Sequence, residues 1–436
     1  MQNKTLLFLL TFTLISESLF AQRQNSDDFY TRYSLCEVVV LSRHNIRSPL
    51  TGSGSVIERM TPHKWYSWSS RPSLLSQKGG VMETMMGQYF NKWLMAEGLF
   101  FEDEIPNKDE IRIYANSMQR TLATAHYFMS GFMPVANVPV VHHCKIGVMD
   151  SIFTPQITYL DDDFCKTAIH EIAEMTREKT EMHKVSPSEY YCVLENTHNR
   201  LADNYKYLYT VLDMRNSLAC KYGDTCGFAG PDTIWLKLFR EPTITGSLQM
   251  ARMASDALIL QYYEEKDDTK AAFVHKLTKN EWLQLSGIKE WYDSILFTTP
   301  SIARQIATPL LNEIAKELNT PGRKFSFLCG HDSNIGSVLA ALGVTDYTLP
   351  NTIETKTPIG AKLVFEKWVD KKNEYYISVK MIFHNTNQIR QGQYSPYENA
   401  PLIFPIQFNG VRANADGLYS FIDFFEILTQ NKINRK

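Results

Sequence analysis

An apolar run near the N-terminus ends in a cluster of charged side chains. Residues 36–41 are largely apolar, as in a buried β-strand, and they are followed by Ser42-Arg43-His44-Asn45-Ile46-Arg47-Ser48-Pro49. This stretch places a histidine between two arginines and contains no acidic residue. Guanidinium groups packed closely repel each other, and their fork geometry suits phosphate or carboxylate. Because histidine can act as a nucleophile or as an acid or base, the stretch predicts a phosphate-handling centre.

A second apolar run, late in the chain, ends in a similar way. Residues 323–329 are typical of a strand, and they are followed by Gly330-His331-Asp332 and by a predicted helix near Ile335. In open α/β sheets, ligands bind at the carboxyl ends of strands, often at helix N-termini. His44 and His331 both fall just past such strand ends. We therefore expect the two histidines at the same edge of one sheet.

The remaining pattern divides the chain into a split domain and an insertion. Strands are predicted at 110–114, 138–141, 361–368 and 375–383, and helices at 76–95 and 119–128. From 151 to 294 helix-like segments dominate, at 164–177, 188–214, 247–263 and 280–296, with few strand signals. The sequence therefore predicts an α/β fold in which a central, mostly parallel sheet is flanked by helices, formed by residues 22–150 and 297–436. A mainly α-helical domain, residues 151–296, is inserted between these halves.

The first residues predict export. Lys4 lies in a short polar start, residues 6–15 are mostly apolar, and Ala21 precedes Gln22 as a cleavage point, so residues 1–21 are typical of a secretory signal peptide. No later run reaches about 18 apolar residues, the length needed for a membrane span. No cysteine immediately follows Ala21. We expect a periplasmic or secreted protein without a membrane anchor.

Charge and cysteine content add two expectations. The net charge of -2 provides no global positive field, which argues against a nucleic-acid partner. Among seven cysteines, Cys220 and Cys226 flank a short polar loop, Lys-Tyr-Gly-Asp-Thr. In an oxidising compartment such a pair favours a disulfide. The sequence does not define an oligomeric state.

The polar residues at the strand ends match the needs of phosphoryl transfer. That reaction requires charge stabilisation around the phosphate oxygens, a nucleophile, and a proton for the leaving group. Arg43, Arg47 and Arg120, which starts a predicted helix after the strand at 110–114, can supply the first. His44 can attack phosphorus, His331 can donate a hydrogen bond to phosphate, and Asp332 can protonate the alkoxide and later activate water. No metal or other cofactor is expected, because the arginines neutralise the phosphate.

Each of these residues also has an ordinary structural interpretation. A Gly-His-Asp after a strand is common, and arginine often begins a surface helix. Their conjunction, each at a strand end, favours catalysis. Other features of the sequence do not indicate a catalytic or metal site. His142-His143-Cys144 lacks the spacing of a zinc site. Neither a Walker-type glycine loop nor a Gly-x-Ser-x-Gly elbow is present.

Taken in order, these residues resemble the histidine acid phosphatase family, whose members open with Arg-His-Gly-x-Arg-x-Pro and carry a late His-Asp. The resemblance is greatest to the branch of bacterial periplasmic glucose-1-phosphatases, with the phytase branch next. It extends over residues 42–50, 115–125, 141–155, 261–264, 291–307, 330–342, 357–360 and 363–368. The resemblance implies an acid phosphatase that forms a phosphohistidine. In it His44 is the nucleophile, Asp332 is the proton donor, and phosphate is bound by Arg43, Arg47, Arg120 and His331.

Departures from the family pattern bear on the substrate. Asn45 stands where most members have glycine. Leu50 and Ser333 replace a polar residue and a threonine of the phytase branch, which favours small sugar phosphates such as glucose 1-phosphate over inositol hexakisphosphate. By resemblance, Glu264 faces the pocket and disfavours strongly anionic substrates. Two alternatives stay open, a phytase and a sugar-phosphate binding protein without turnover.

Overall fold

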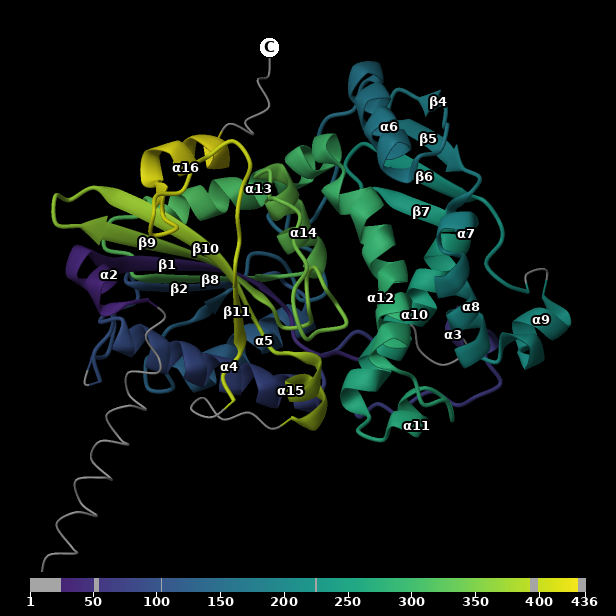
Figure 1. Ribbon diagram of the computed structural model, residues 1–436, viewed down its shortest axis with the longest axis horizontal. Coiled ribbons are helices and arrows are strands. Elements are labelled where there is room, and N and C mark those ends of the chain that lie inside the picture. The colour runs from purple at the N-terminus through teal and green to yellow at the C-terminus, as the bar shows by residue number, and fades with distance from the viewer. Residues whose placement is uncertain (1–24, 51–54, 103, 224–225, 393–398, 430–436) are drawn as a thin grey trace, which may run out of the picture.

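The computed structural model describes residues 25–50, 55–102, 104–223, 226–392 and 399–429 (Figure 1). The predicted signal peptide, residues 1–21, lies outside this described part. Over the described ranges, none of the helices has the length and apolar character needed to span a lipid bilayer.

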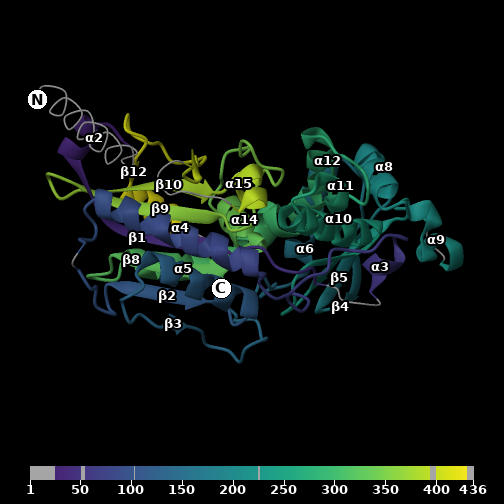
Figure 2. The same cartoon turned by 90° about the horizontal axis from the view of Figure 1, so that it is seen from below.

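Eight strands of the described chain form one mixed sheet. In spatial order the path runs β11-β10-β9-β1-β8-β2-β3, with β12 paired to β10, and Figure 2 shows this order from β10 to β3. The strands are β1 (Tyr33–Arg43), β2 (Ile111–Ala115), β3 (Val140–Val141), β8 (Phe325–Gly330), β9 (Lys362–Asp370), β10 (Tyr375–Phe383), β11 (Leu402–Pro405) and β12 (Tyr419–Ser420). β1, β8, β2 and β3 pair in parallel, whereas β9, β10, β11 and β12 pair antiparallel.

Helices cover both faces of this sheet, and this explains why β1 is an almost continuous apolar run. Val38 and Val40 pack into one core cluster with α4 (Gln77–Ala96) and α5 (Gln119–Phe132). Val39 and Leu41 pack into another with helices that include α13 (Pro300–Leu318), α14 (Asp332–Ala341) and α16 (Phe421–Thr429), on the opposite face (Figure 1). A strand covered on both sides is apolar along nearly its whole length. The predicted α/β class is confirmed.

The register of the parallel strands brings three strand ends to one level. Arg43 of β1 pairs with Gly330 of β8, and Ala115 of β2 pairs with Cys329. The residues that follow, His44, His331 and Asn116, therefore emerge together at the same edge. The predicted juxtaposition of the two histidines is confirmed.

The inserted segment contains more β-structure than predicted. Its helices include α6 (Asp162–Thr176), α8 (Ala202–Val211), α10 (Ser247–Glu264) and α12 (Lys279–Asp293), near four predicted helices. Its strands are β4 (His183–Ser186), β5 (Glu189–Leu194), β6 (Asp232–Lys237) and β7 (Thr243–Gly246), and they form an antiparallel sheet. The helix predicted over 188–214 is therefore wrong at its start. Burial alternates along β5, with every second residue buried, which is the period of a strand covered on one face.

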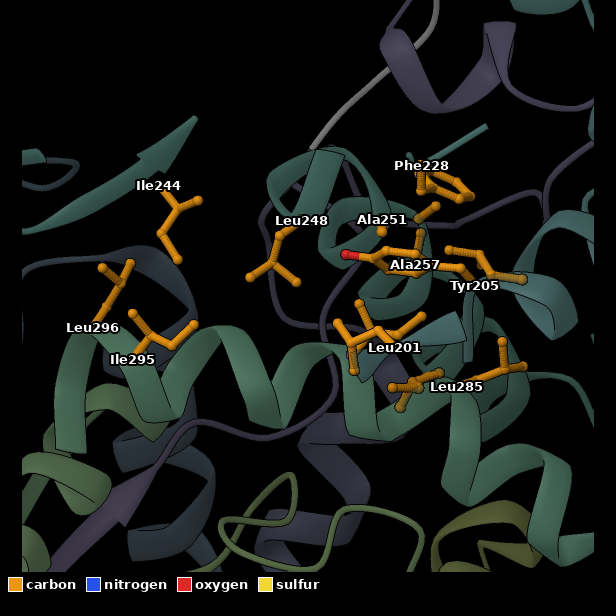
Figure 3. Close-up of a cluster of buried hydrophobic side chains, with 14 of the residues drawn as sticks. Leu201, Tyr205, Phe228, Ile244, Leu248, Ala251, Ala257, Leu285, Ile295 and Leu296 are labelled. Atoms are coloured by element: carbon orange, nitrogen blue, oxygen red, sulfur yellow. The ribbon is translucent and has the colours of Figure 1, made fainter. Parts of the chain in front are cut away.

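A single core unites the helices of this segment with its sheet. Figure 3 shows part of it, with Ile295 and Leu296 at one end and Leu201, Tyr205 and Leu285 at the other. α10 and α12 lie on the side that faces the strand ends of the larger sheet (Figure 1). Because the core also includes residues on both sides of the segment, such as Ile46, the boundaries at 150/151 and 296/297 stay a prediction.

The predicted disulfide is confirmed. Cys220 of α9 (Leu218–Tyr222) is bonded to Cys226, with their Cα atoms 4.5 Å apart. The bridge joins two cysteines six positions apart, as their spacing indicated.

Candidate active site

Arg43, the last residue of β1, is buried and surrounded by acceptors from distant segments. Its Nη1 donates to Glu354 Oε1 at 2.6 Å and to the carbonyl of Thr357. Its Nη2 lies 3.2 Å from Asp332 Oδ2. The stretch around Arg43 has no acidic residue, so the fold supplies both carboxylates from elsewhere in the chain.

Among the described residues, one ring nitrogen of His44 has a hydrogen-bond partner and the other has none. Its main-chain N–H donates to Gly330 O at 3.1 Å, and its Nδ1 lies 2.9 Å from Asn45 O. A carbonyl oxygen only accepts, so Nδ1 carries the proton and the lone pair of a neutral ring is on Nε2. Burial, together with the charges on Arg120, His331 and the flanking arginines, lowers the pKa of His44 well below its ordinary value. A neutral imidazole with a free Nε2 is the form that can attack phosphorus.

Asn45 fixes the loop that carries this histidine. Its main-chain N–H donates to Thr124 Oγ1 at 3.1 Å, and its Nδ2 donates to Glu83 Oε2 at 2.8 Å. Glu83 in turn pairs with Lys362 Nζ at 2.8 Å, and neither side chain is exposed. Gly360 approaches Asn45 so closely that a Cβ there would lie 2.6 Å from Asn45 Nδ2. The side chain at position 45 thus links the loop to α4 and β9, which glycine could not do.

Arg47 points its guanidinium at the inserted segment. Its Nη2 lies 3.0 Å from Oδ2 of Asp256, a buried residue of α10, and its Nη1 donates to Ser48 O at 3.1 Å. Burial would raise the pKa of Asp256, but Arg47 and Arg252 outweigh it and lower this pKa. Asp256 is therefore a carboxylate whose charge is balanced by the site arginines.

Arg120 and His331 complete the cluster. Arg120 Nη1 donates to Ser73 Oγ at 2.9 Å, and its Nη2 lies 3.4 Å from His331 Nδ1. The rings of His331 and His44 have centroids 5.5 Å apart. Burial and the charge of Arg120 lower the pKa of His331 to about 3. Burial and the charge of Arg47 lower the pKa of Arg120 to about 10, so it remains a cation at neutral pH.

The three predicted arginines have donors that the described residues leave unused. Nε of Arg43, Arg47 and Arg120 is buried in each case and has no hydrogen-bond partner within the described ranges. A buried N–H without an acceptor costs free energy, about 1–3 kcal/mol and more near a charge. An oxyanion supplies several acceptors to guanidinium groups at once. The arrangement is that of an anion-binding site beside His44.

Asp332, the first residue of α14, lies between two cations. Its Oδ2 is 2.7 Å from Lys289 Nζ of α12 and 3.2 Å from Arg43 Nη2, and its Oδ1 accepts from Ser333 N at 3.0 Å. Burial would raise its pKa, but Lys289 and Arg43 hold the pKa of Asp332 well below the ordinary value. The structure thus brings all six predicted residues together: Arg43, His44, Arg47, Arg120, His331 and Asp332.

Comparison with known proteins identifies the family. A family model described as histidine phosphatase superfamily (branch 2) matches residues 34–384. The chain belongs to this superfamily. The glucose-1-phosphatase of Salmonella typhimurium is 33% identical over 401 residues, which cover 91% of this chain and 92% of that protein. The glucose-1-phosphatase of Providencia rettgeri is 31% identical over 437 residues and covers 99% of each chain.

Solved structures support the same fold. The apo form of Hafnia alvei phytase matches with a TM-score of 0.80 and 23% identity, over 92% of this chain and 97% of that chain. The family model and the two glucose-1-phosphatases confirm the predicted family, and the chain is a phosphatase that acts on small phosphorylated substrates.

A small cavity of this phosphatase adjoins the arginines. It has a volume of about 220 Å³ and is lined by Pro49, Leu50, Gln249, Arg252, Met253, Asp256 and Tyr292. Asp256 connects it to the anion site through Arg47. Leu50, which replaces a polar residue of the phytase branch, forms part of the wall, so the cavity combines an apolar side with one cation and one carboxylate.

Glu264 of the phosphatase lies farther along α10 than Asp256. Eight residues separate them, about 12 Å along a helix axis. Its Oε2 accepts from Ser76 Oγ at 3.1 Å, and Ser76 caps the N-terminus of α4. Burial raises the pKa of Glu264. The role of Glu264 in substrate choice stays a prediction. Asp256, by contrast, contacts Arg47 directly.

Sequence reasoning missed several charged residues around the phosphatase site. They are Asp256, Lys289, Asp293 and Glu354. Lys289 and Asp293 stand four residues apart in a predicted helix, a spacing that favours an ion pair. That spacing was a usable signal, but the pattern alone does not indicate which helix face meets the strand ends.

Proposed function

We propose that this phosphatase hydrolyses small sugar phosphates, glucose 1-phosphate among them, through a covalent phosphohistidine on His44. The observation that carries the proposal is the free Nε2 of a neutral, buried His44 among arginines whose Nε–H groups lack acceptors within the described ranges. Arg43, Arg47, Arg120 and His331 bind the phosphate. Preorganised donors of this kind stabilise the charge that develops on phosphate oxygens in the transition state.

The reaction takes place in two steps. In the first, the Nε2 lone pair of His44 forms an N–P bond, the P–O bond to the sugar breaks, and Asp332 gives its proton to the leaving oxygen. In the second, the Asp332 carboxylate takes a proton from water, the water oxygen bonds to phosphorus, and the N–P bond breaks. Phosphate leaves, His44 is neutral again, and Asp332 again carries the proton with which it entered the first step.

Two observations support a small leaving group. The relatives that match at 33% and 31% identity are both glucose-1-phosphatases. The cavity beside Arg47, about 220 Å³, is smaller than the roughly 300–1,000 Å³ of pockets for drug-sized ligands. Arg252 offers donors and Asp256 offers acceptors, a combination that suits sugar hydroxyls. A leaving group with several phosphates would place its charge against Asp256.

A phytase activity is the second candidate. It is favoured by Arg252, which lines the cavity beside Arg47 and whose buried Nε has no hydrogen-bond partner over the described chain. Comparing kcat/KM on glucose 1-phosphate and on inositol hexakisphosphate separates the two. A higher value on inositol hexakisphosphate would overturn the sugar-phosphate proposal.

Export is part of the proposal. The signal-like residues 1–21 and the Cys220–Cys226 disulfide support a periplasmic or secreted enzyme. Fractionation of cells that express the full chain should place the protein, shortened at its N-terminus, outside the cytoplasm.

The covalent intermediate has a direct test. Wild-type protein mixed with labelled glucose 1-phosphate and quenched in alkali should carry a phosphoryl group that is stable in alkali and lost in acid, as expected of phosphohistidine. His44→Ala should carry none and should lose turnover of p-nitrophenyl phosphate. Full activity of His44→Ala would contradict the mechanism, and binding of glucose 1-phosphate without any release of phosphate by the wild type would indicate a binding protein.

A further inference from the structure

We propose that Lys289 and Asp293 of α12 act as a pair of positioning residues that set the protonation state of Asp332. The inference rests on the proposed function, in which Asp332 first donates a proton and then accepts one. It assigns to the inserted segment a part in the chemistry itself, in addition to lining the cavity.

The geometry is a single ammonium group shared by two carboxylates. Lys289 Nζ lies 2.7 Å from Asp332 Oδ2 and forms an ion pair with Asp293 Oδ2. The Lys289 side chain is only 4% exposed, and those of Asp293 and Asp332 are each 19% exposed. A buried charge without a partner costs free energy, so these three side chains are held in contact with one another. Asp293 follows Lys289 by one helical turn, which positions both on the same face of α12.

Asp332 alone is poorly suited to donate a proton. In the structure its Oδ2 contacts both Lys289 and Arg43. A protonated acid loses much of its attraction to these two cations, so the resting group is a carboxylate. A phosphatase acting on sugar phosphates nevertheless needs a neutral Asp332, because a sugar alkoxide is a poor leaving group. A further group must therefore favour proton uptake.

Asp293 supplies the opposing charge. Two carboxylates that share one cation repel each other, and a proton on one of them relieves the repulsion. Burial and the charge of Asp332 raise the pKa of Asp293, although Lys289 opposes this. When phosphate engages Arg43, the attraction between Arg43 and Asp332 weakens, and the anionic phosphate favours a proton on Asp332. After transfer to the leaving oxygen, Lys289 stabilises the new Asp332 carboxylate, which can then deprotonate water.

Other charged groups also act on Asp332, and they remain constant in the test. Arg43 and His44 approach from β1 and its loop, and the adjacent His331 also interacts with Asp332. Glu354, from the segment after α14, pairs with Arg43. Arg252 and Asp256 of α10 and Arg120 of α5 interact with Asp332 electrostatically. Because these groups are the same in each variant below, a difference between variants reports on the α12 pair.

The test uses two substitutions with opposite expected effects. Lys289→Met removes the closest cation, so protonated Asp332 should persist to higher pH. Asp293→Asn removes the competing anion, so Asp332 should lose its proton at lower pH. In the pH profile of kcat for glucose 1-phosphate, the alkaline limb should move to higher pH in Lys289→Met and to lower pH in Asp293→Asn. Each shift should be about one to three pH units at most. Lys289→Arg, which keeps the charge, should leave the limb near its wild-type position.

Opposite shifts separate this role from a purely structural one. Lost packing lowers kcat without moving the limb, and thermal melting of each variant identifies such loss. A limb that stays in place in Asp293→Asn, or that moves in the same direction in both substitutions, would overturn the inference. Lys289→Met could fail to fold, because it leaves buried carboxylates unpaired. In that case Asp293→Asn is compared with the double substitution. The alkaline limb of the kcat profile of the double variant should lie at higher pH than that of Asp293→Asn.

Failure of the proposed function gives a different result. An inactive wild type, or an active His44→Ala, contradicts the phosphohistidine mechanism whatever the α12 variants do. A wild type that behaves as proposed, with a limb unaffected by Asp293→Asn, contradicts only the role of the pair.

Discussion

The Arg47 guanidinium lies 3.0 Å from the Asp256 carboxylate, although 209 residues separate them in the sequence. The contact joins the loop after β1 to α10 of the inserted segment. It gives the anion site a buried negative group at the wall of the adjoining cavity. In this cavity the carboxylate would repel a leaving group that carries further phosphates, so Asp256 is expected to influence substrate choice.

Removing the charge at Asp256 should change selectivity. Asp256→Asn is expected to raise the ratio of kcat/KM for inositol hexakisphosphate to that for glucose 1-phosphate several-fold, because it removes the negative charge that repels further phosphates. Glu264→Gln is the matched comparison on the same helix. Since Glu264 contacts Ser76 rather than a site arginine, its effect on the ratio should be smaller. Equal effects of the two substitutions would contradict this ranking.

Asp332→Asn should discriminate between leaving groups. A sugar alkoxide needs a proton to depart, whereas p-nitrophenolate does not. We expect kcat/KM for glucose 1-phosphate to fall about 10²-fold or more, within the range for lost general acid catalysis, and that for p-nitrophenyl phosphate to fall much less. Parallel losses on both substrates would count against Asp332 as the proton donor.

Buried histidines should make the fold sensitive to acid. Burial and the charge of Lys362 lower the pKa of His384 to about 3, so between this value and the ordinary pKa the unfolded chain binds a proton that the folded chain excludes. The stabilisation is complete above the unfolded pKa and is lost as pH falls toward 3, at about 1.4 kcal/mol per pH unit. His384→Gln should flatten the fall of unfolding free energy from pH 6 to pH 4, measured with denaturant. An unchanged slope would show that His384 titrates normally.

The buried pair below the nucleophile loop should separate stability from activity. Lys362→Met leaves Glu83 buried without its cation and should cost about 3–5 kcal/mol of unfolding free energy. The double substitution Glu83→Leu and Lys362→Met should restore much of that stability, because both charges are gone. Its kcat should stay low, since Asn45 has lost its anchor. Recovery of kcat together with stability would mean that the anchor does not position His44.

Most of the confirmed predictions rest on local sequence patterns. An uninterrupted apolar run with charged residues at its end identifies β1 and β8 and indicates that both are covered on two faces. His44, His331 and Asp332 follow such runs directly, so their location could be predicted without knowledge of tertiary contacts. The helix predicted at 76–95 is also found, as α4 (Gln77–Ala96), and Ser76 Oγ accepts from Gly79 N at its start.

Long-range partners could not be predicted in this way. Lys289 is an ordinary helical lysine in the sequence and becomes a partner of Asp332 only because α12 faces α14. Glu354 reaches Arg43 from a segment without regular structure. β5 was predicted as helix because five of its six residues are apolar or aromatic, so its sequence does not show the period of two that its burial has.

The parallel register of β1 and β8 limits how the lengths of these two strands can vary. His44 and His331 are held level by main-chain pairing, including the bond from His44 N to Gly330 O, rather than by their side chains. Deleting one residue from β1 would draw His44 back by about 3.3 Å and turn its side chain to the other face of the sheet. Loops outside these strands can lengthen or shorten without such an effect. The lengths of β1 and β8 are therefore constrained together, because a one-residue change in either strand alone would move one histidine away from the other.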